Sequence, residues 1–198
     1  MTTEERIRGA AIRVFSREGF HRARMREIAE EAGIAVGSIY NYFASKEELL
    51  VSLFEDEFEA RLSFLKELQR RSAPIRETLQ RLLEEHFSFV RVQPELAQLL
   101  LRERFNRGGK LSDRLIVLQR RMVERIGQII SRGIEDGWIR PCDPSIVAQG
   151  LYDLIQTMSA CGIVYEKERA EEILKAAPEE LASLIWQGLK AGAGDEAD

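Results

Sequence analysis

The residues best suited to bind a ligand lie between positions 24 and 46, and their types favour nucleic acid. Two short segments with helical apolar spacing, about 25–32 and 35–42, are joined through Gly33, which predicts two helices connected by a tight turn. The second segment exposes short, polar or aromatic side chains, and no Asp or Glu occurs between Ala32 and Ser45. Because an acid-free helix surface suits phosphates and base edges, this pattern predicts a helix-turn-helix that binds DNA.

The distribution of charge supports this interpretation, although two surface helices of a plain bundle could also be joined by a glycine. The whole chain carries a net charge of −4. Residues 1–46 hold eight basic and six acidic residues, a net of +2, which leaves 21 basic and 27 acidic residues, or −6, for the remainder. Such an asymmetry indicates that the N-terminal segment contacts a polyanion.

The elements that must position these residues are all predicted to be helices. With 198 residues, 44% of them apolar, the chain is long enough to bury a core without disulfides or metals. Helical periodicity, with Thr2 and Ser45 as caps, predicts nine helices, and Pro178 is expected to begin the last one. We expect an all-α fold with three parts: a three-helix DNA-binding domain at 1–46, a helical ligand-binding and dimerisation domain at 47–192, and a disordered tail at 193–198.

Four motifs within the first 50 residues carry a specific resemblance: Gly19-Phe20, IAEEAGI at 28–34, GSIYNYF at 37–43 and SKEELL at 45–50. They resemble the TetR family of bacterial transcriptional regulators. The resemblance implies that the second short helix enters the major groove of DNA. Departures occur at Ala23-Arg24, where relatives often have two Ser or Thr residues, and at Ala35-Val36, where they often have Ser-Lys. These changes remove hydroxyl caps worth about 1 kcal/mol each, so the operator sequence cannot be inferred from relatives.

The resemblance also assigns roles to individual residues. Val36 would contact a thymine methyl group, Gly37 would let the backbone approach DNA, and Asn41 would pair with adenine. Ala35 belongs to the same predicted DNA-binding set, and Tyr40 has packing as an alternative role. Phosphate contacts are expected from the remaining polar and cationic residues, which are Arg24, Arg26, Ser38, Tyr40, Tyr42 and Lys46.

A homodimer is implied as well, with a four-helix interface formed by the last two helices of each subunit. A two-fold dimer would read two half-sites about one helical turn apart, which predicts a roughly palindromic operator. The expected interface residues are Leu151, Leu154, Ile155, Met158, Leu181, Leu184, Ile185 and Gly188.

Residues 86–105 (HFSFVRVQPELAQLLLRERF) and 132–137 (RGIEDG) resemble, more weakly, the acyl-CoA-responsive regulators of fatty-acid degradation. A long-chain acyl-CoA, which would release the protein from DNA, needs an apolar tunnel and cations for its phosphates. Plain core packing, a solvated face for the arginines, and a drug or other hydrophobic effector remain open alternatives. The candidate ligand-binding residues are Phe87, Val90, Leu101, Arg102, Phe105, Arg107, Met122, Ile126 and Tyr152.

No catalytic residue, cofactor or metal site is expected. The motifs HExxH, GxSxG and GxGxxG and the P-loop are absent, so a helical acyl-binding enzyme or carrier is only a remote alternative. The two histidines and two cysteines lack metal-ligand spacing, and His86 is expected to be a hydrogen-bonded core residue. The start of the chain does not resemble a signal peptide and no apolar run has membrane-spanning length, which predicts a cytoplasmic protein.

Overall fold

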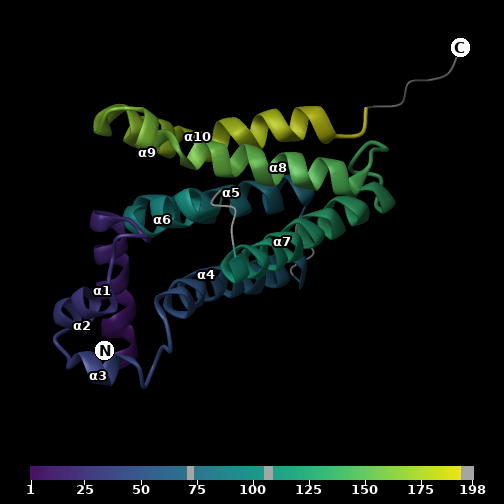
Figure 1. Ribbon diagram of the computed structural model, residues 1–198. Coiled ribbons are helices and arrows are strands. Elements are labelled where there is room, and N and C mark those ends of the chain that lie inside the picture. Colours follow the sequence, from purple (N-terminus) through teal and green to yellow (C-terminus); the bar gives the residue numbers. More distant parts are fainter. Residues whose placement is uncertain (71–73, 105–108, 193–198) are drawn as a thin grey trace, which may run out of the picture. The chain divides into compact units, whose positions relative to one another are not determined.

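The computed structural model describes residues 1–70, 74–104 and 109–192 (Figure 1). Helices dominate, and the described residues contain no β-strand, so the predicted all-α fold class is confirmed. In chain order the helices are α1 (Thr3–Glu18), α2 (Met25–Ala32), α3 (Val36–Ile39), α4 (Lys46–Arg70), α5 (Ile75–Val92), α6 (Pro94–Arg104), α7 (Gly109–Glu135), α8 (Pro144–Ser159), α9 (Cys161–Val164) and α10 (Lys167–Leu189).

The C-terminal helix differs from the prediction, because α10 runs through Pro178 instead of beginning there. A proline inside a helix removes one backbone hydrogen bond and normally kinks or ends it. Here an apolar face extends on both sides of the proline, with Leu174 and Leu181 both buried, and α10 packs along α5. Burial of this continuous face compensates for the missing bond, so the prediction that Pro178 starts the helix is wrong.

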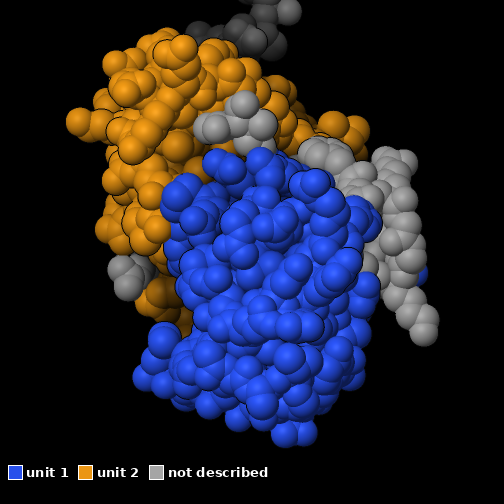
Figure 2. All heavy atoms as spheres, turned by 60° about the vertical axis from the view of Figure 1, so that its left-hand side comes forward, with its two compact units in different colours: residues 1–60, 93–118 blue, residues 61–92, 119–198 orange. Residues whose placement is uncertain are grey.

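Contacts divide the chain into two compact units, which Figure 2 colours separately. Unit 1 comprises residues 1–60 and 93–118, and unit 2 comprises residues 61–92 and 119–198. Helices α4 and α7 each contribute residues to both units. The functional boundary expected after residue 46 therefore stays a prediction, and the predicted disordered tail at 193–198 lies outside the described residues.

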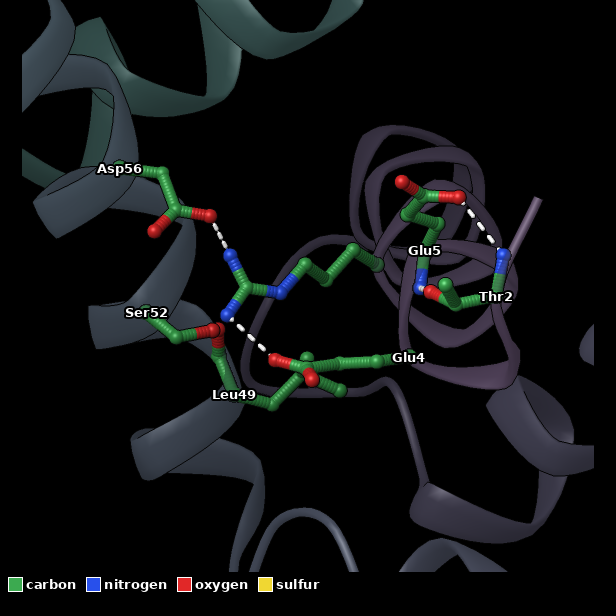
Figure 3. A network of polar contacts seen from close by, with 7 residues as sticks. Thr2, Glu4, Glu5, Leu49, Ser52 and Asp56 are labelled. Atoms are coloured by element: carbon green, nitrogen blue, oxygen red, sulfur yellow. Dashed lines mark hydrogen bonds and ion pairs between the residues drawn. The ribbon is translucent and has the colours of Figure 1, made fainter.

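Unit 1 is organised around α1, whose apolar residues recur at helical spacing and are all buried: Ile7, Ala10, Ala11, Val14 and Phe15. The predicted capping box at its start is confirmed (Figure 3). The Thr2 hydroxyl accepts a hydrogen bond from the Glu5 N–H at 3.1 Å, and the Glu5 carboxylate accepts one from the Thr2 N–H at 2.7 Å. The helix ends at Gly19, which has a φ of +78°.

A cation connects α1 with α4 within the same unit. The Arg8 guanidinium forms one ion pair with Glu4, one turn earlier in α1, and a second with Asp56 of α4; Figure 3 labels both carboxylates. The same guanidinium lies 5.7 Å from the centroid of the buried Phe43 ring. Arg8 thereby connects Phe43, which follows α3, with α1 and α4.

Unit 2 is built on the packing of α5 against α10, with α8 against both. The apolar face that α5 buries consists of Leu79, Leu83, Phe87 and Val90. The segment after α7 returns to the end of α10, where Ile139 and Lys190 form an isolated antiparallel bridge. In the parts of the chain that the structure describes, no helix combines the length and apolar character needed to cross a membrane.

Candidate nucleic-acid interface

Residues 35–42, called the reading segment below, comprise α3 and the turn after it. They follow α2, and α2 lacks a side-chain cap. Arg24 occupies the N-cap position without a capping hydrogen bond from its side chain. The Glu27 carboxylate instead accepts a hydrogen bond from the Arg24 N–H at 2.8 Å. One reciprocal half of a capping box thus remains and offsets part of the lost hydroxyl cap. The apolar face expected for this helix is buried, and consists of Met25, Ile28, Ala29 and Ala32.

The turn between the two short helices requires glycine, as the sequence predicts. Gly33 has φ +65° and ψ 40°, a left-handed conformation, and its N–H donates to the Glu30 carbonyl at 3.1 Å. A guanidinium N–H of Arg6, from α1, donates to the carbonyls of Ala32 at 2.6 Å and Gly33 at 3.2 Å. The end of α2 is therefore held by a cation as well as by its own turn.

The second short helix, α3, is shorter than the predicted 35–42, because residues 40–42 form turns instead. Backbone N–H groups of Tyr42 and Phe43 both donate to the Ile39 carbonyl, which closes this turn on the helix end. Ile39 and Phe43 are buried at 0% and 6% exposure. These two side chains anchor the segment in unit 1 and leave most of its other residues exposed.

Most of the predicted DNA-contacting residues of this segment are exposed, and Ser38 is half-buried. Tyr40 keeps 51% of its surface exposed and Tyr42 keeps 46%, so the alternative packing role of Tyr40 has no support in this structure. Gly37 has open space around the position of a Cβ atom, which leaves its backbone accessible. The exposed members are Ala35, Val36, Gly37, Tyr40, Asn41 and Tyr42.

Several cations near this segment already have carboxylate partners. Arg26 pairs with Glu30 at 2.8 Å on the surface, and this hydrogen bond raises the pKa of Arg26. Arg13 pairs with Glu31 at 2.8 Å, and the hydrogen bond lowers the pKa of that carboxyl. Arg17 pairs with Glu18. These three cations are partly neutralised, so a phosphate would have to compete with a carboxylate for each of them.

Arg24, also predicted to contact DNA, is exposed and forms no ion pair with any carboxylate that the structure describes.

Lys46 is arranged differently from the expected phosphate contact. Its ammonium donates to the carbonyls of Phe20, His21 and Ala23 at 2.8, 3.1 and 3.1 Å. All three N–H groups are then in use, so a phosphate could bind Lys46 only by replacing a carbonyl.

The predicted ligand-binding residues are distributed over both units. Phe87, Val90, Met122, Ile126 and Tyr152 are all buried in unit 2. Leu101 is half-buried and Arg102 is exposed, and both belong to unit 1. Phe105 and Arg107 lie outside the described residues. The five buried residues belong to the apolar interior of unit 2, and their burial fits plain core packing as well as the lining of an acyl-chain tunnel.

The predicted dimer residues fall into three groups. Ile155, Leu181 and Ile185 are buried at 5–8% exposure within the chain's own fold. Leu184 is 62% exposed and Gly188 is exposed, so these two can meet a second subunit. Ile146, on the same pair of helices, is 72% exposed and is a stronger interface candidate than the three buried residues. The remaining members, which are half-buried, are Leu151, Leu154 and Met158.

The expectation that His86 is hydrogen-bonded is confirmed, and this half-buried residue of α5 contacts one residue of α4 and one of α8 within unit 2. Nδ1 lies 2.8 Å from a guanidinium nitrogen of Arg61, and Nε2 lies 2.6 Å from the Ser159 hydroxyl. That hydroxyl in turn donates to the Ile155 carbonyl at 2.9 Å. Burial, and secondarily the charge of Arg61, hold the pKa of His86 well below its usual value, so the ring is neutral with its proton on Nε2.

Two residues near the candidate interface were not anticipated from the sequence. Arg6 bonds to carbonyls 26 and 27 positions away, and no local pattern marks such a long-range contact. Arg22 is exposed beside Arg24 and bonds only to the Glu18 carbonyl, through Nε at 2.9 Å, among the contacts of the described residues. Residues 19–24 contain Arg22 and Arg24 but no Asp or Glu, and this local excess of basic residues could have identified Arg22 from the sequence. The described residues contain no group of three or more His, Cys, Asp or Glu side chains suited to a metal ion.

Comparison with family models is consistent with this geometry. Residues 7–53 match the N-terminal model described as bacterial regulatory proteins, tetR family. Residues 72–160 match a second model, described as a tetracyclin repressor-like C-terminal domain. The two matches together cover more than half of the chain.

The chain is also similar to individual proteins. The fatty acid metabolism regulator protein of Bacillus subtilis is 28% identical over 131 residues, which is 66% of this chain and 68% of that protein. The transcriptional regulator FadR of the same organism, solved in complex with stearoyl-CoA, superimposes with a TM-score of 0.84 at 23% identity over 93% of this chain and 98% of that one. AibR, solved with isovaleryl coenzyme A and operator DNA, gives a TM-score of 0.69 at 21% identity over 90% and 97%. At these identities the structures show a shared fold.

Proposed function

This chain belongs to the TetR family of bacterial regulatory proteins, and from that premise we propose that it is a homodimeric transcriptional repressor whose effector is a long-chain acyl-CoA. Operator binding is assigned to α3 and the turn after it. The observation that carries this assignment is the outward-facing, acid-free segment from Ala35 to Tyr42, anchored by Ile39 and Phe43. Val36 on the helix and Tyr40 and Tyr42 in the turn after it form an exposed surface without acidic neighbours, and the family context favours double-stranded DNA as its partner.

Within this proposal the exposed residues divide by chemistry. The Asn41 amide has the donor and acceptor needed to pair with adenine, and Val36 can contact a thymine methyl group. Ser38, Tyr40 and Tyr42 have hydroxyl groups that suit phosphate oxygens. Phosphates are also assigned to the remaining cations, Arg24, Arg26 and Lys46, although the last two must first give up part of their present hydrogen bonds.

Dimerisation is assigned to the exposed apolar residues of α8 and α10, led by Ile146 and Leu184. A two-fold pair of reading segments would recognise two half-sites about one helical turn apart, and a roughly palindromic operator follows.

We place the protein in the cytoplasm, where it would meet chromosomal DNA. The transcriptional regulators among its relatives also favour a regulatory over an enzymatic role.

The assignment of acyl-CoA rests on two supports. Unit 2 contains buried apolar residues on several helices, among them Phe87, Met122, Ile126 and Tyr152, which suit an acyl chain. Two proteins of the same fold were solved with a coenzyme A thioester. An effector that releases DNA must have a higher affinity for the conformation that does not bind the operator than for the one that does. The typical coupling free energy between two such sites is about 1–3 kcal/mol.

Thermal unfolding of the purified dimer with a ladder of acyl-CoAs tests the effector. Free CoA and free fatty acids serve as matched controls. A ligand at about 100 times its dissociation constant adds roughly 2.7 kcal/mol to the free energy of unfolding, which is a visible shift of the midpoint. A shift that peaks at one chain length and is absent with CoA alone supports the proposal. No shift with any thioester refutes it and directs the search to drug-like and aromatic compounds.

A second measurement tests release itself. A duplex selected by the protein from a random-sequence pool is titrated with and without the acyl-CoA that stabilises it. Weaker binding with the effector is the expected result. An unchanged affinity would show that the ligand binds without regulating, whereas failure to select any duplex would refute the DNA-binding role.

A further inference from the structure

We propose that residues 19–24, called the α1–α2 turn below, form a second DNA-binding segment. In this segment Arg22 contacts a backbone phosphate, and Lys46 positions the turn through hydrogen bonds to its carbonyls. This inference rests on the proposed DNA-binding function and adds a contact residue that the family pattern does not assign. It also gives Lys46 a positioning role beside the phosphate contact assigned to it above.

The α1–α2 turn is built rigidly from its first residue. Gly19 adopts a φ of +78°, which an L side chain rarely adopts, and its carbonyl accepts a hydrogen bond from the Ala23 N–H at 3.1 Å. The Phe20 ring is 5% exposed and packs edge-on against Phe15 of α1, with 5.5 Å between ring centroids. The backbone of this turn is therefore fixed to the core of unit 1.

Lys46 completes this support from the first residue of α4. Its ammonium donates to three carbonyls of the turn, those of Phe20, His21 and Ala23, and lies 4.7 Å from the centroid of the Phe20 ring. Carbonyl acceptors are neutral, so the positive charge of Lys46 is not cancelled, but its donors are committed to the turn. A cation in this arrangement orients the segment and adds to its positive potential.

Arg22 is the cation that this support presents to solvent. Its Nε donates to the Glu18 carbonyl at the end of α1, which directs the side chain while both terminal nitrogens keep their N–H groups available. No carboxylate in the described chain pairs with Arg22, in contrast to Arg13, Arg17 and Arg26 nearby. An exposed, oriented and uncompensated guanidinium has the charge and the paired donors that a phosphate requires.

The salt dependence of DNA binding separates a phosphate contact from a general loss of charge. Each neutralised phosphate contributes about 0.9 to the slope of log K against log salt concentration, so removing one contact from each subunit lowers the slope by about 1.8. Counted from a common intercept at 1 M salt, this is about a 60-fold loss of affinity at 0.1 M.

The test compares Arg22→Gln with Arg17→Gln on the duplex selected by the wild-type protein. Both variants lose one exposed cation per subunit, but Arg17 is already paired with Glu18. We expect the slope to fall by about 1.8 for Arg22→Gln and to stay within about 0.5 of the wild type for Arg17→Gln. Equal slopes for the two variants overturn the proposal. If the wild type itself selects no duplex, the proposed function fails instead.

The positioning role of Lys46 is tested by a double-mutant cycle of Lys46→Met with Arg22→Gln. If Lys46 acts through the turn, the double variant loses clearly less affinity than the product of the two single losses. Lys46→Arg, which keeps the charge and donors to carbonyls, is expected to restore binding. Fully multiplicative losses overturn the positioning role. Thermal unfolding of each variant confirms that the compared proteins are folded.

Discussion

The hydrogen-bond chain through His86 makes a specific prediction about how stability depends on pH. Within unit 2, Arg61 of α4 donates to Nδ1, Nε2 donates to Ser159 of α8, and the serine hydroxyl donates onward to a carbonyl. A proton added to Nδ1 would face the guanidinium of Arg61. The folded protein therefore resists protonation of His86, in agreement with the lowered pKa caused by burial and by Arg61.

The sign and size of the effect follow from linkage. Because the folded pKa of His86 lies below the unfolded value of about 6.5, the unfolded chain takes up the proton first as pH falls. The stabilising contribution is complete above the unfolded pKa and decreases as pH drops toward the folded one. Between pH 7.5 and 5.5 the cost is about 1.4 kcal/mol per subunit, which follows from the fraction of unfolded histidine that becomes charged.

Urea unfolding at pH 7.5, 6.5 and 5.5, at one fixed protomer concentration, measures this difference. The matched variant is His86→Gln, whose side-chain amide can donate to Ser159 and accept from Arg61 but does not titrate. We expect the wild type to lose about 1.4 kcal/mol more than the variant over this range. All other titrating groups are common to the two proteins and cancel. Parallel pH profiles would refute the assignment of a neutral, proton-resistant His86.

Three further predictions concern packing, assembly and base recognition. Gly133→Ala places a Cβ 2.7 Å from Cδ1 of the buried Ile139, and we expect it to lower the free energy of unfolding in urea by about 1–3 kcal/mol. The matched control is Gly127→Ala, where the nearest atom to the new Cβ is 3.7 Å away. We expect this variant to raise the free energy of unfolding by up to about 1 kcal/mol. Leu184→Glu puts a charge on each side of the proposed dimer interface, so the dimer dissociation constant in sedimentation should rise at least about 100-fold; an unchanged dimer would place the interface elsewhere. Asn41→Ala removes one adenine contact from each subunit, at about 1–3 kcal/mol per contact, so it should weaken binding to the selected duplex at least about 30-fold. The salt slope should not change, and a reduced slope would reassign Asn41 to a phosphate.

Local patterns in the sequence were sufficient for the elements that depend on neighbours in the chain. The capping box of Thr2 and Glu5 and the left-handed turn at Gly33 involve residues a few positions apart, and both are confirmed. The physical reason is that such contacts form within one or two helical turns and need no knowledge of tertiary structure.

Features set by tertiary packing could not be obtained in this way. Pro178 signals a helix start locally, but the packing of α10 along α5 keeps the helix continuous through it. Burial of Ile155 and Ile185 inside the subunit depends on how the helices of unit 2 rotate about their axes. The roles of Lys46 and Arg6 likewise depend on carbonyls more than 20 residues away.

The arrangement of cations in unit 1 explains how a chain with a net charge of −4 can still present a DNA-binding surface. An ion pair with a carboxylate removes most of the field of a cation, as for Arg13, whereas a hydrogen bond to a neutral carbonyl leaves its charge in place. Arg6, Arg22 and Lys46 all donate to carbonyls. These residues orient the reading segment and the α1–α2 turn while they keep their positive charge. If the proposed DNA-binding function holds, the same cations would provide both structural support and phosphate attraction. A count of charges along the sequence would then underestimate the positive potential that DNA meets.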